Sequence, residues 1–243
     1  MKFKLNKLLL MLTFALIIFT SQSSLFSQTK ISFEKQNTGK KYKSFSFGMG
    51  AIYSNNSSLV DFVKVDLPNF SINPRVTDIH SLDVGIEFFG SAEFQISSVW
   101  SLKAEYSYFT KNISLPSGTN ASYSYNSHIP LLNLSYIKRS DFIFFKFGAG
   151  IGYTSSTFTR SIFNSDTKYT ASGFVFKPEI TANAQLSNSV AGYISGFLDF
   201  KFTSDLKDDS GNDPPRPGVI GGSPVNLNSQ GVGIRLGLSF YIF

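Results

Sequence analysis

Twelve charged residues lie on the polar faces of alternating segments, and ten of them are separated from one another by even numbers of positions, as in Glu87 and Glu93 or Lys177 and Glu179. Side chains two positions apart point to the same side of a β-strand, so each group would share one face. Such a face could line a water-filled pore that conducts ions, or its charges could form buried ion pairs. Six acids balance six bases, whereas selectivity filters use rings of one charge, so we favour ion pairs. The twelve are Asp83, Glu87, Glu93, Lys103, Glu105, Lys111, Lys146, Lys177, Glu179, Asp199, Lys201 and Arg235.

Hydrolytic chemistry would need a histidine base beside a nucleophile, and the chain has only two histidines. His80 adjoins Ser81, and His128 adjoins Ser127. Neighbours on a strand point to opposite faces, so neither pair forms a dyad. A pairing across strands stays open, but no motif supports it. We therefore expect no catalytic residue and no cofactor, and a lipid-modifying enzyme is the weakest alternative.

Clustered carboxylates, which suit calcium, occur in one segment only. Asp205, Asp208, Asp209 and Asp213 lie within residues 203–230. Their spacing lacks the ligand order of an EF-hand and has no closing glutamate. We expect a solvated acidic loop and no bound metal.

The elements that must position the charged side chains are β-strands, and the clearest strand lies at the C-terminus. From Val232 to Ile242, apolar residues alternate with polar or small ones without a break, which gives one apolar and one polar face. The same pattern recurs seven more times, and each segment reaches the ~9–11 residues that a tilted membrane strand requires. The eight segments are residues 44–53, 82–96, 100–111, 125–137, 143–153, 174–186, 194–202 and 232–242.

Short and long connections alternate between these segments. The tight turns are residues 97–99, 138–141 and 187–189, and the long polar loops are residues 54–80, 112–124, 154–172 and 203–230. Outer-membrane barrels have short periplasmic turns and long external loops, and closure removes strand edges that lipid cannot hydrogen-bond. The pattern predicts an all-β fold over residues 44–243: a closed, antiparallel, eight-stranded, up-and-down transmembrane barrel.

Bulky residues are placed to suit such a barrel. On the polar face, large side chains are expected opposite inward glycines and would complement them in volume, so that side chains fill an eight-stranded lumen. On the apolar face, aromatic or apolar residues stand at both strand ends, as in membrane girdles. The inward set is Phe89, Phe109, Tyr193 and Phe197; the girdle set is Tyr53, Tyr106, Tyr108, Tyr153 and Phe202 near the loops, and Phe94, Trp100, Phe240 and Ile242 near the turns.

Residues 1–27 are organised as a secretory signal peptide. Three lysines precede an apolar run over residues 8–19, which is too short to span a bilayer, and small polar residues follow. Cleavage fits after Ser23 or after Ser27, and we favour Ser27. Residues 28–43 are polar and basic without alternation, so we expect a flexible periplasmic lead-in.

Composition excludes several classes of protein. The chain carries a net charge of +6, and loss of the three signal lysines would lower it to about +3, too little to indicate a nucleic-acid partner. The absence of cysteine excludes disulfides and a lipoprotein anchor. Packing and hydrogen bonds alone must hold the fold.

Three stretches carry a resemblance to a known family: WSLKAEYSYF (residues 100–109), NLSYIKRSDFIFFKFGAGIGY (133–153) and GIRLGLSFYIF (233–243). They resemble the small eight-stranded barrels of the OmpX and OmpA-transmembrane type, in particular the outer-membrane β-barrel family common in Bacteroidetes. The resemblance implies insertion into the outer membrane of a Gram-negative bacterium. Its motifs are architectural and imply no activity.

The last of these stretches resembles the C-terminal signal by which such barrels are assembled. Arg235, Gly237, Phe240 and Ile242 match the signal in order, and Phe243 is one extra residue after it. The resemblance implies two partners, outer-membrane lipid and the barrel assembly machinery. We expect a monomer.

These observations predict a non-enzymatic barrel with a plugged lumen, acting in envelope integrity or in surface binding through its loops. A small porin-like channel is the alternative. The first long loop, residues 54–80, is called loop one, and among its polar residues are Leu59, Val60, Phe62, Val63, Val65 and Leu67. Their rough alternation fits either a strand pair protruding from the membrane, which could bind a surface ligand, or a segment folded over the barrel mouth.

Overall fold

The computed structural model describes residues 41–66, 84–114, 121–139, 143–163, 165–214 and 224–242. The predicted signal peptide, His80, Asp83 and Phe243 lie outside these ranges. The described elements are β1 (Lys43–Asn55), α2 (Ser57–Asp66), β2 (Val84–Gln95), β3 (Trp100–Ser114), β4 (Ala121–Arg139), β5 (Ile143–Ile162), β6 (Ser165–Gln185), β7 (Val190–Thr203) and β8 (Ser229–Ile242).

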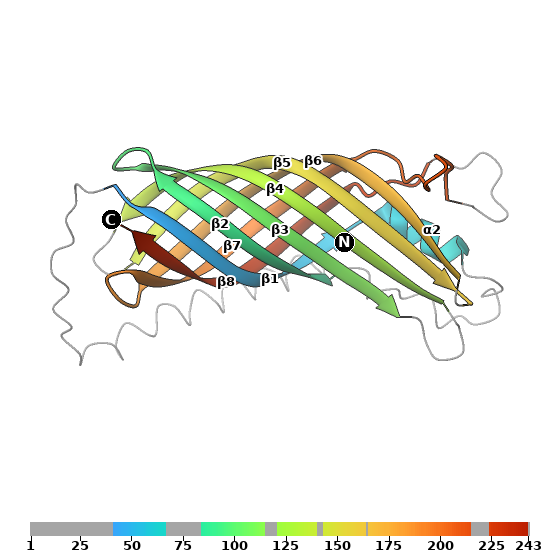
Figure 1. The fold of residues 1–243 in the computed structure, drawn as a ribbon, viewed down its shortest axis with the longest axis horizontal. Coiled ribbons are helices and arrows are strands. Elements are labelled where there is room, and N and C mark those ends of the chain that lie inside the picture. Colours follow the sequence, from blue (N-terminus) through green and yellow to red (C-terminus); the bar gives the residue numbers. More distant parts are fainter. Residues whose placement is uncertain are drawn as a thin grey trace, which may run out of the picture. The chain divides into compact units, whose positions relative to one another are not determined.

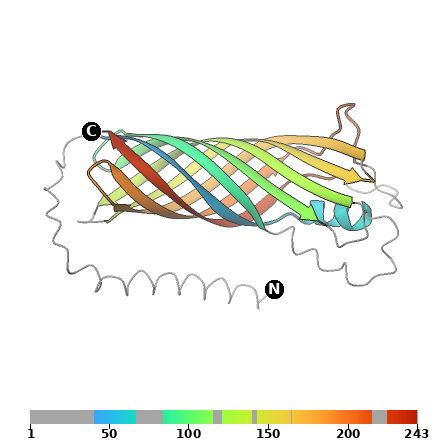
Figure 2. The same ribbon diagram turned by 60° about the horizontal axis from the view of Figure 1, so that its bottom comes forward.

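The strands form one closed barrel in chain order, each antiparallel to its neighbours (Figure 1). β8 completes the ring by pairing with β1, from Ile242 opposite Lys43 to Gln230 opposite Asn55. The predicted fold class is therefore confirmed. Figure 2 shows that β8 ends at the opposite end of the barrel from α2.

The polarity of the wall is the reverse of that in a water-soluble protein. Leu236 points outward and is 59% exposed, whereas its neighbour Arg235 points inward and is 1% exposed. Phe47, Leu132 and Ile180 are similarly exposed on other strands. An apolar outer surface around a polar interior suits lipid, so the barrel crosses a membrane. No helix in the described ranges is long and apolar enough to span one.

Two of the three predicted short turns, residues 97–99 and 187–189, lie where the sequence predicts them, at one end of the barrel. Ile96 donates its amide hydrogen to Trp100, and Leu186 donates to Val190, which closes the β2–β3 and β6–β7 turns. Trp100 packs edge-on against Tyr136 near this end. The β4–β5 connection, residues 140–142, lies outside the described residues.

At the other end, the predicted loop over residues 154–172 is wrong. β5 continues to Ile162, β6 begins at Ser165, and Phe163 between them has a positive φ of 50°. The predicted loop over residues 112–124 is likewise shortened from both sides by β3 and β4. Serine and threonine suggested loops by their polarity, but threonine favours strands, and above a membrane a strand needs no apolar outer face.

Residues 57–66 of loop one form the helix α2, so the strand pair, one of the two arrangements predicted for this loop, is wrong for that part of it. The side chain of Asn56 accepts a hydrogen bond from the amide of Leu59 at 2.9 Å and caps α2. Leu59, Phe62 and Val63 share one helical face, and all three are buried in the hydrophobic core. α2 lies at the loop end of the barrel (Figure 2). The side chains of Val65 and Leu67 are outside the description.

Candidate functional site

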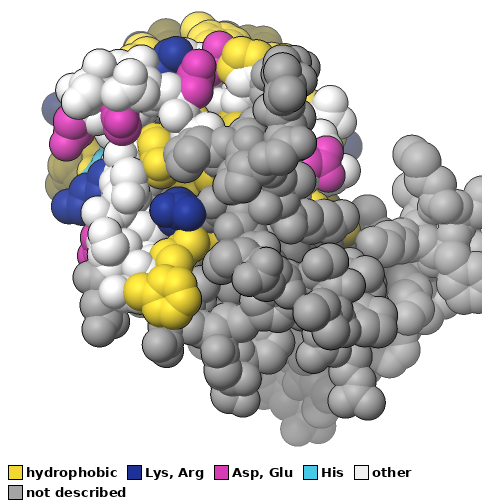
Figure 3. All heavy atoms as spheres, turned by 90° about the vertical axis from the view of Figure 1, so that its right-hand side faces the viewer, with side chains coloured by type: hydrophobic (Ala, Val, Ile, Leu, Met, Phe, Trp, Pro, Cys, Tyr) yellow, Lys and Arg dark blue, Asp and Glu magenta, His cyan; other side chains and the backbone are white. Residues whose placement is uncertain are grey.

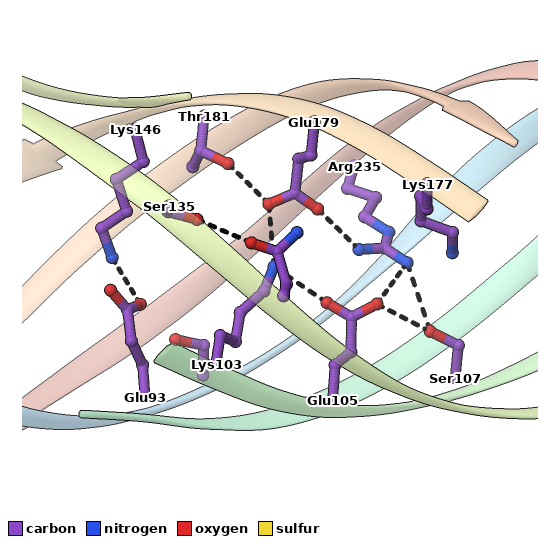
Figure 4. Close-up of polar contacts among 12 residues, drawn as sticks. Glu93, Lys103, Glu105, Ser107, Ser135, Lys146, Lys177, Glu179, Thr181 and Arg235 are labelled. Carbon is purple, nitrogen blue, oxygen red and sulfur yellow. Dashed lines mark hydrogen bonds and ion pairs between the residues drawn. The ribbon is translucent and has the colours of Figure 1, made fainter. Parts of the chain in front are cut away.

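The structure places eleven of the twelve predicted charged residues inside the barrel, and Asp83 lies outside the described residues. Ten of the eleven are buried, and the side chain of Lys103 is 13% exposed. They come from six strands: β2, β3, β5, β6, β7 and β8. Figure 4 shows those near the middle of the lumen, among them Glu105, Glu179 and Arg235, pointing toward one another. The interior is therefore ionic where the outer wall is apolar.

Arg235 stands at the centre of this interior. Its guanidinium contacts three carboxylates: Nε donates to Glu87 at 2.7 Å, one terminal nitrogen to Glu105 at 2.8 Å, and the other to Glu179 at 3.1 Å. These acids lie on β2, β3 and β6. One cation thus joins three strands that do not pair with its own.

Two lysines complete a balanced central cluster. Lys177 contacts Glu87 at 2.8 Å, and Lys103 contacts Glu105 at 2.9 Å and Glu179 at 2.8 Å. Together with Arg235, they match three carboxylates with three cations. Each carboxylate has two cationic partners, the arrangement that a buried charge requires.

A second charged layer closes the turn end of the lumen. Lys146 pairs with Glu93 at 2.5 Å, and the hydroxyl of Tyr42 donates to Glu93 at 3.0 Å. The ring of Tyr42 lies edge-on against Tyr241, 5.1 Å away. Tyr42 falls within the predicted lead-in, yet its side chain is buried in the barrel. Sequence reasoning missed it because one inward residue before a strand shows no alternation.

Aromatic rings fill the remaining space. Phe89 and Phe197 both contact the Arg235 guanidinium as cation–π partners, with each ring centre 4.6 Å from its central carbon. A Cβ atom at Gly233 would overlap the ring of Phe197. This glycine therefore provides the room that the ring occupies, as the predicted pairing of large and small residues requires.

Toward the loop end, the lumen becomes apolar. Lys201 pairs with Asp199 on its own strand at 3.4 Å and lies over the ring of Phe109 at 4.5 Å. Lys111 is also buried here. Beyond them, a hydrophobic cluster includes Phe158 and Tyr123, and α2 packs into it. Side chains thus occupy three successive levels between the turns and the mouth.

Sequence reasoning missed the role of α2, although a signal for it was present. Leu59, Phe62 and Val63 follow the i, i+3, i+4 spacing of an amphipathic helix, and Asn56 is a favourable cap. The spacing of Val63 and Val65 fits a strand equally well, and this obscured the helical period. Phe62 contacts the ring of Phe158 edge-on at 5.9 Å, which anchors the helix to β5.

Phe62→Ala should release α2 and leave the barrel folded. Truncating a buried phenylalanine costs about 3–5 kcal/mol, and here the loss falls on one short helix. We expect proteolysis within residues 57–66 to accelerate about tenfold or more. The heat-modifiable band of the folded barrel should remain unchanged on gels. Asp61→Ala, an exposed change on the same helix, is the matched control and should alter neither readout; equal cleavage of the two variants would contradict the anchoring role.

His128 points to the outer face of β4. Its Nδ1 atom lies 2.6 Å from the hydroxyl of Tyr106, while Ser127 points inward. Ser155 lies opposite His128 on β5, but no hydrogen bond joins the two in the described part of the chain. No acid–base–nucleophile arrangement is formed by these residues.

In the acidic segment after β7, residues 205–213, Asp208 and Asp213 bind neighbouring residues of the same segment. Asp208 accepts hydrogen bonds from the amides of Asn212 and Ser210, and the bond from Asn212 lowers the pKa of this carboxyl most. Asp213 pairs with Lys207 at 2.8 Å, and this hydrogen bond raises the pKa of the lysine. Among the residues that the structure describes, no three histidine or acidic side chains gather to hold a metal ion. Acidic and basic side chains are seen together at this end of the barrel in Figure 3.

Among solved structures, a major outer membrane protein from Thermus thermophilus matches with a TM-score of 0.51 at 14% identity, covering 82% of this chain and 99% of that one. The fold is that of an outer-membrane β-barrel. Neisserial surface protein A (TM-score 0.47, 10% identity, 82% of this chain and 96% of that one) also matches. So does Ail, the attachment invasion locus protein of Yersinia pestis (TM-score 0.46, 7% identity, 84% of this chain and 99% of that one).

No protein-family model matches the chain, and no curated protein matches its sequence. At the identities above, the structural likeness concerns the fold and not the activity. The predicted resemblance to small outer-membrane barrels is confirmed at that level. Its Bacteroidetes branch stays a prediction.

Proposed function

We propose that this protein is a non-enzymatic outer-membrane barrel with a plugged lumen, which acts in envelope integrity or in binding at the cell surface. The observation that carries the proposal is the occupancy of the interior by side chains. The Glu93 layer, the Arg235 cluster and the hydrophobic cluster under α2 follow one another along the lumen. A barrel built mainly to pass solutes would keep that space for water.

The energetics of the central cluster support the same conclusion. A permeating ion would have to separate Arg235 from Glu87, Glu105 or Glu179, which it contacts at 2.7 to 3.1 Å. Breaking a buried pair on one side typically costs about 3–5 kcal/mol. The cluster also balances in sign, so it offers no preference for cations or anions that a selective channel would need.

Surface binding, the second part of the proposal, is assigned to the end that carries α2. There β3 to β6 extend furthest and α2 caps the interior (Figure 1). Binding residues tend to lie on segments outside a rigid scaffold, because the scaffold is committed to its own packing. The acidic segment at residues 205–213 belongs to the same end.

Planar-bilayer recording tests the plugged lumen. The purified barrel should give no stable single-channel steps at any polarity, because the ionic and apolar levels leave no path for hydrated ions. Insertion must be verified in the same membranes by the heat-modifiable band and by protection of the barrel from protease. Otherwise, a lack of conductance caused by failed insertion could be mistaken for a plugged lumen. Reproducible ion-selective steps from inserted protein would overturn the proposal in favour of a small channel.

A further inference from the structure

The outer surface of β3 to β6 changes character abruptly above the membrane. Three successive cross-strand rows there carry polar side chains, nine of which are serine, threonine or asparagine. We call these twelve positions the hydroxyl face. The rows are Tyr108, His128, Ser155 and Ser172; Thr110, Asn126, Thr157 and Thr170; and Asn112, Ser124, Thr159 and Lys168.

The composition of the hydroxyl face differs from that of an ordinary solvated sheet. Lys168 is its one residue with a permanent charge, and long flexible acids and bases are otherwise missing from these twelve described positions. Serine, threonine and asparagine lose little side-chain entropy when they are held by a ligand.

The lowest rows are held in place by side-chain contacts. The hydroxyl of Tyr108 donates to the side-chain oxygen of Asn126 at 3.1 Å, and its ring lies 5.1 Å from that of His128. His128 is also joined to Tyr106 at 2.6 Å. These contacts fix two aromatic rings and an amide on the outer wall before any ligand arrives.

The position of the hydroxyl face indicates what lies against it. Directly below it, Tyr106, Tyr153, Phe174 and Phe202 point outward as an aromatic girdle, and they are all strongly exposed. Such girdles mark the boundary between lipid chains and head groups. The face is therefore continuous with the lipid-facing wall and stands at the height of the head groups. Its inner side is already covered, because Tyr123, Phe158 and α2 belong to one core.

We propose that the hydroxyl face binds the uncharged sugar rings of glycolipid head groups that surround the barrel in the outer leaflet. Sugar hydroxyls donate and accept hydrogen bonds, as do those of serine and threonine, and a sugar ring can lie on the face of Tyr108 or His128. A phosphate is a poorer fit, because Lys168 is the one cation within the face and Asp166 lies in the next row. Lys207, which pairs with Thr170 beside the central row, is already bound to Asp213 at 2.8 Å. The inference rests on the proposed outer-membrane location.

Removing three hydroxyls from the central row tests this proposal. In Thr110→Val/Thr157→Val/Thr170→Val, the β-branched shape is kept and the hydrogen-bonding groups are lost. The probe is the dephosphorylated core oligosaccharide of a lipopolysaccharide, titrated calorimetrically into the purified barrel in zwitterionic detergent. We expect saturable binding to the wild-type protein and binding at least about tenfold weaker to the valine variant, which corresponds to ~1.4 kcal/mol.

The matched control is the triple serine variant at the same positions, which keeps the hydroxyls and loses the methyl groups. Its affinity should stay within about twofold of the wild type, a difference of ~0.4 kcal/mol. Equal losses in the two variants, binding that requires the phosphates, or no saturable binding to a correctly folded barrel would each overturn the inference and leave the barrel's proposed role intact. A chain that failed to enter membranes would instead contradict the proposed function itself.

Discussion

Arg235→Ala should lower the free energy of unfolding of the barrel by about 3–5 kcal/mol, because it leaves buried charge without its partner. The guanidinium is 1% exposed and contacts Glu87, Glu105 and Glu179. After truncation, three carboxylates would face only Lys103 and Lys177 in a lumen that water does not freely enter. Urea unfolding in lipid vesicles, followed by the fluorescence of the single tryptophan, Trp100, measures the loss.

Two variants show whether the loss belongs to the charge cluster. Arg235→Lys keeps the charge but cannot reach three carboxylates with a planar fork, so its loss should be smaller than that of the alanine variant. Lys138→Ala removes an exposed cation near the end of β4 and should change stability by less than about 0.5 kcal/mol. If Arg235→Ala matched Lys138→Ala, the cluster would not stabilise the fold. Refolding into vesicles needs no assembly machinery, so it measures the loss of stability separately from the predicted role of Arg235 in the assembly signal.

Phe240→Asp should reduce the amount of protein in the outer membrane several-fold and leave precursor or degraded chain in the periplasm. Phe240 lies on the outer face of β8, with its ring 5.6 Å from that of Phe47 and opposite Phe45. We propose that the assembly machinery reads this apolar face before the barrel closes. Fractionation of cells followed by immunoblotting measures the distribution.

Phe45→Asp is the matched control, since the two residues face each other across β1 and β8 at one depth. Both variants place a carboxylate against lipid near the turn end, where the thermodynamic cost is modest, at about 0–1 kcal/mol. Both should therefore refold into vesicles without any machinery. In cells, only the β8 variant should be depleted. Equal depletion of the two would assign the effect to the lipid contact and contradict recognition of the last strand.

The fold was predictable because a membrane imposes a simple rule on each strand. Alternation places Leu236 outward and Arg235 inward whatever the rest of the chain does, and the structure follows it. The rule weakens beyond the membrane, where both faces of a strand can be polar. For that reason, residues 154–162 were predicted as loop although they continue β5. The helix in loop one was missed because its six scattered apolar residues fit the two-residue period of a strand as well as the 3.6-residue period of a helix.

The partners of the charged residues were beyond sequence reasoning. Which residues of a strand point inward follows from their alternation along it, but contacts across the lumen depend on strand tilt and stagger. Arg235 meets Glu179 and Glu87, which precede it by 56 and 148 residues, and no local pattern encodes those distances along the chain. The predicted list therefore named the members of the cluster without their pairing. Two ion pairs join residues two positions apart on one strand, and simple spacing could have given both: Lys103 with Glu105 on β3, and Lys201 with Asp199 on β7.

The placement of Arg235 on β8 couples closure of the barrel to completion of its charge cluster. Glu87, Glu105 and Glu179 lie on β2, β3 and β6, so they gain their shared cation only when β8 takes its place in the wall. A seven-stranded intermediate would hold these three acids with two cations, and it would have to keep water inside to solvate the unmatched charge. Docking of β8 supplies the missing charge and seals the wall in one step. Partially closed barrels are thereby disfavoured, so that closure of the wall and completion of the charge cluster are cooperative.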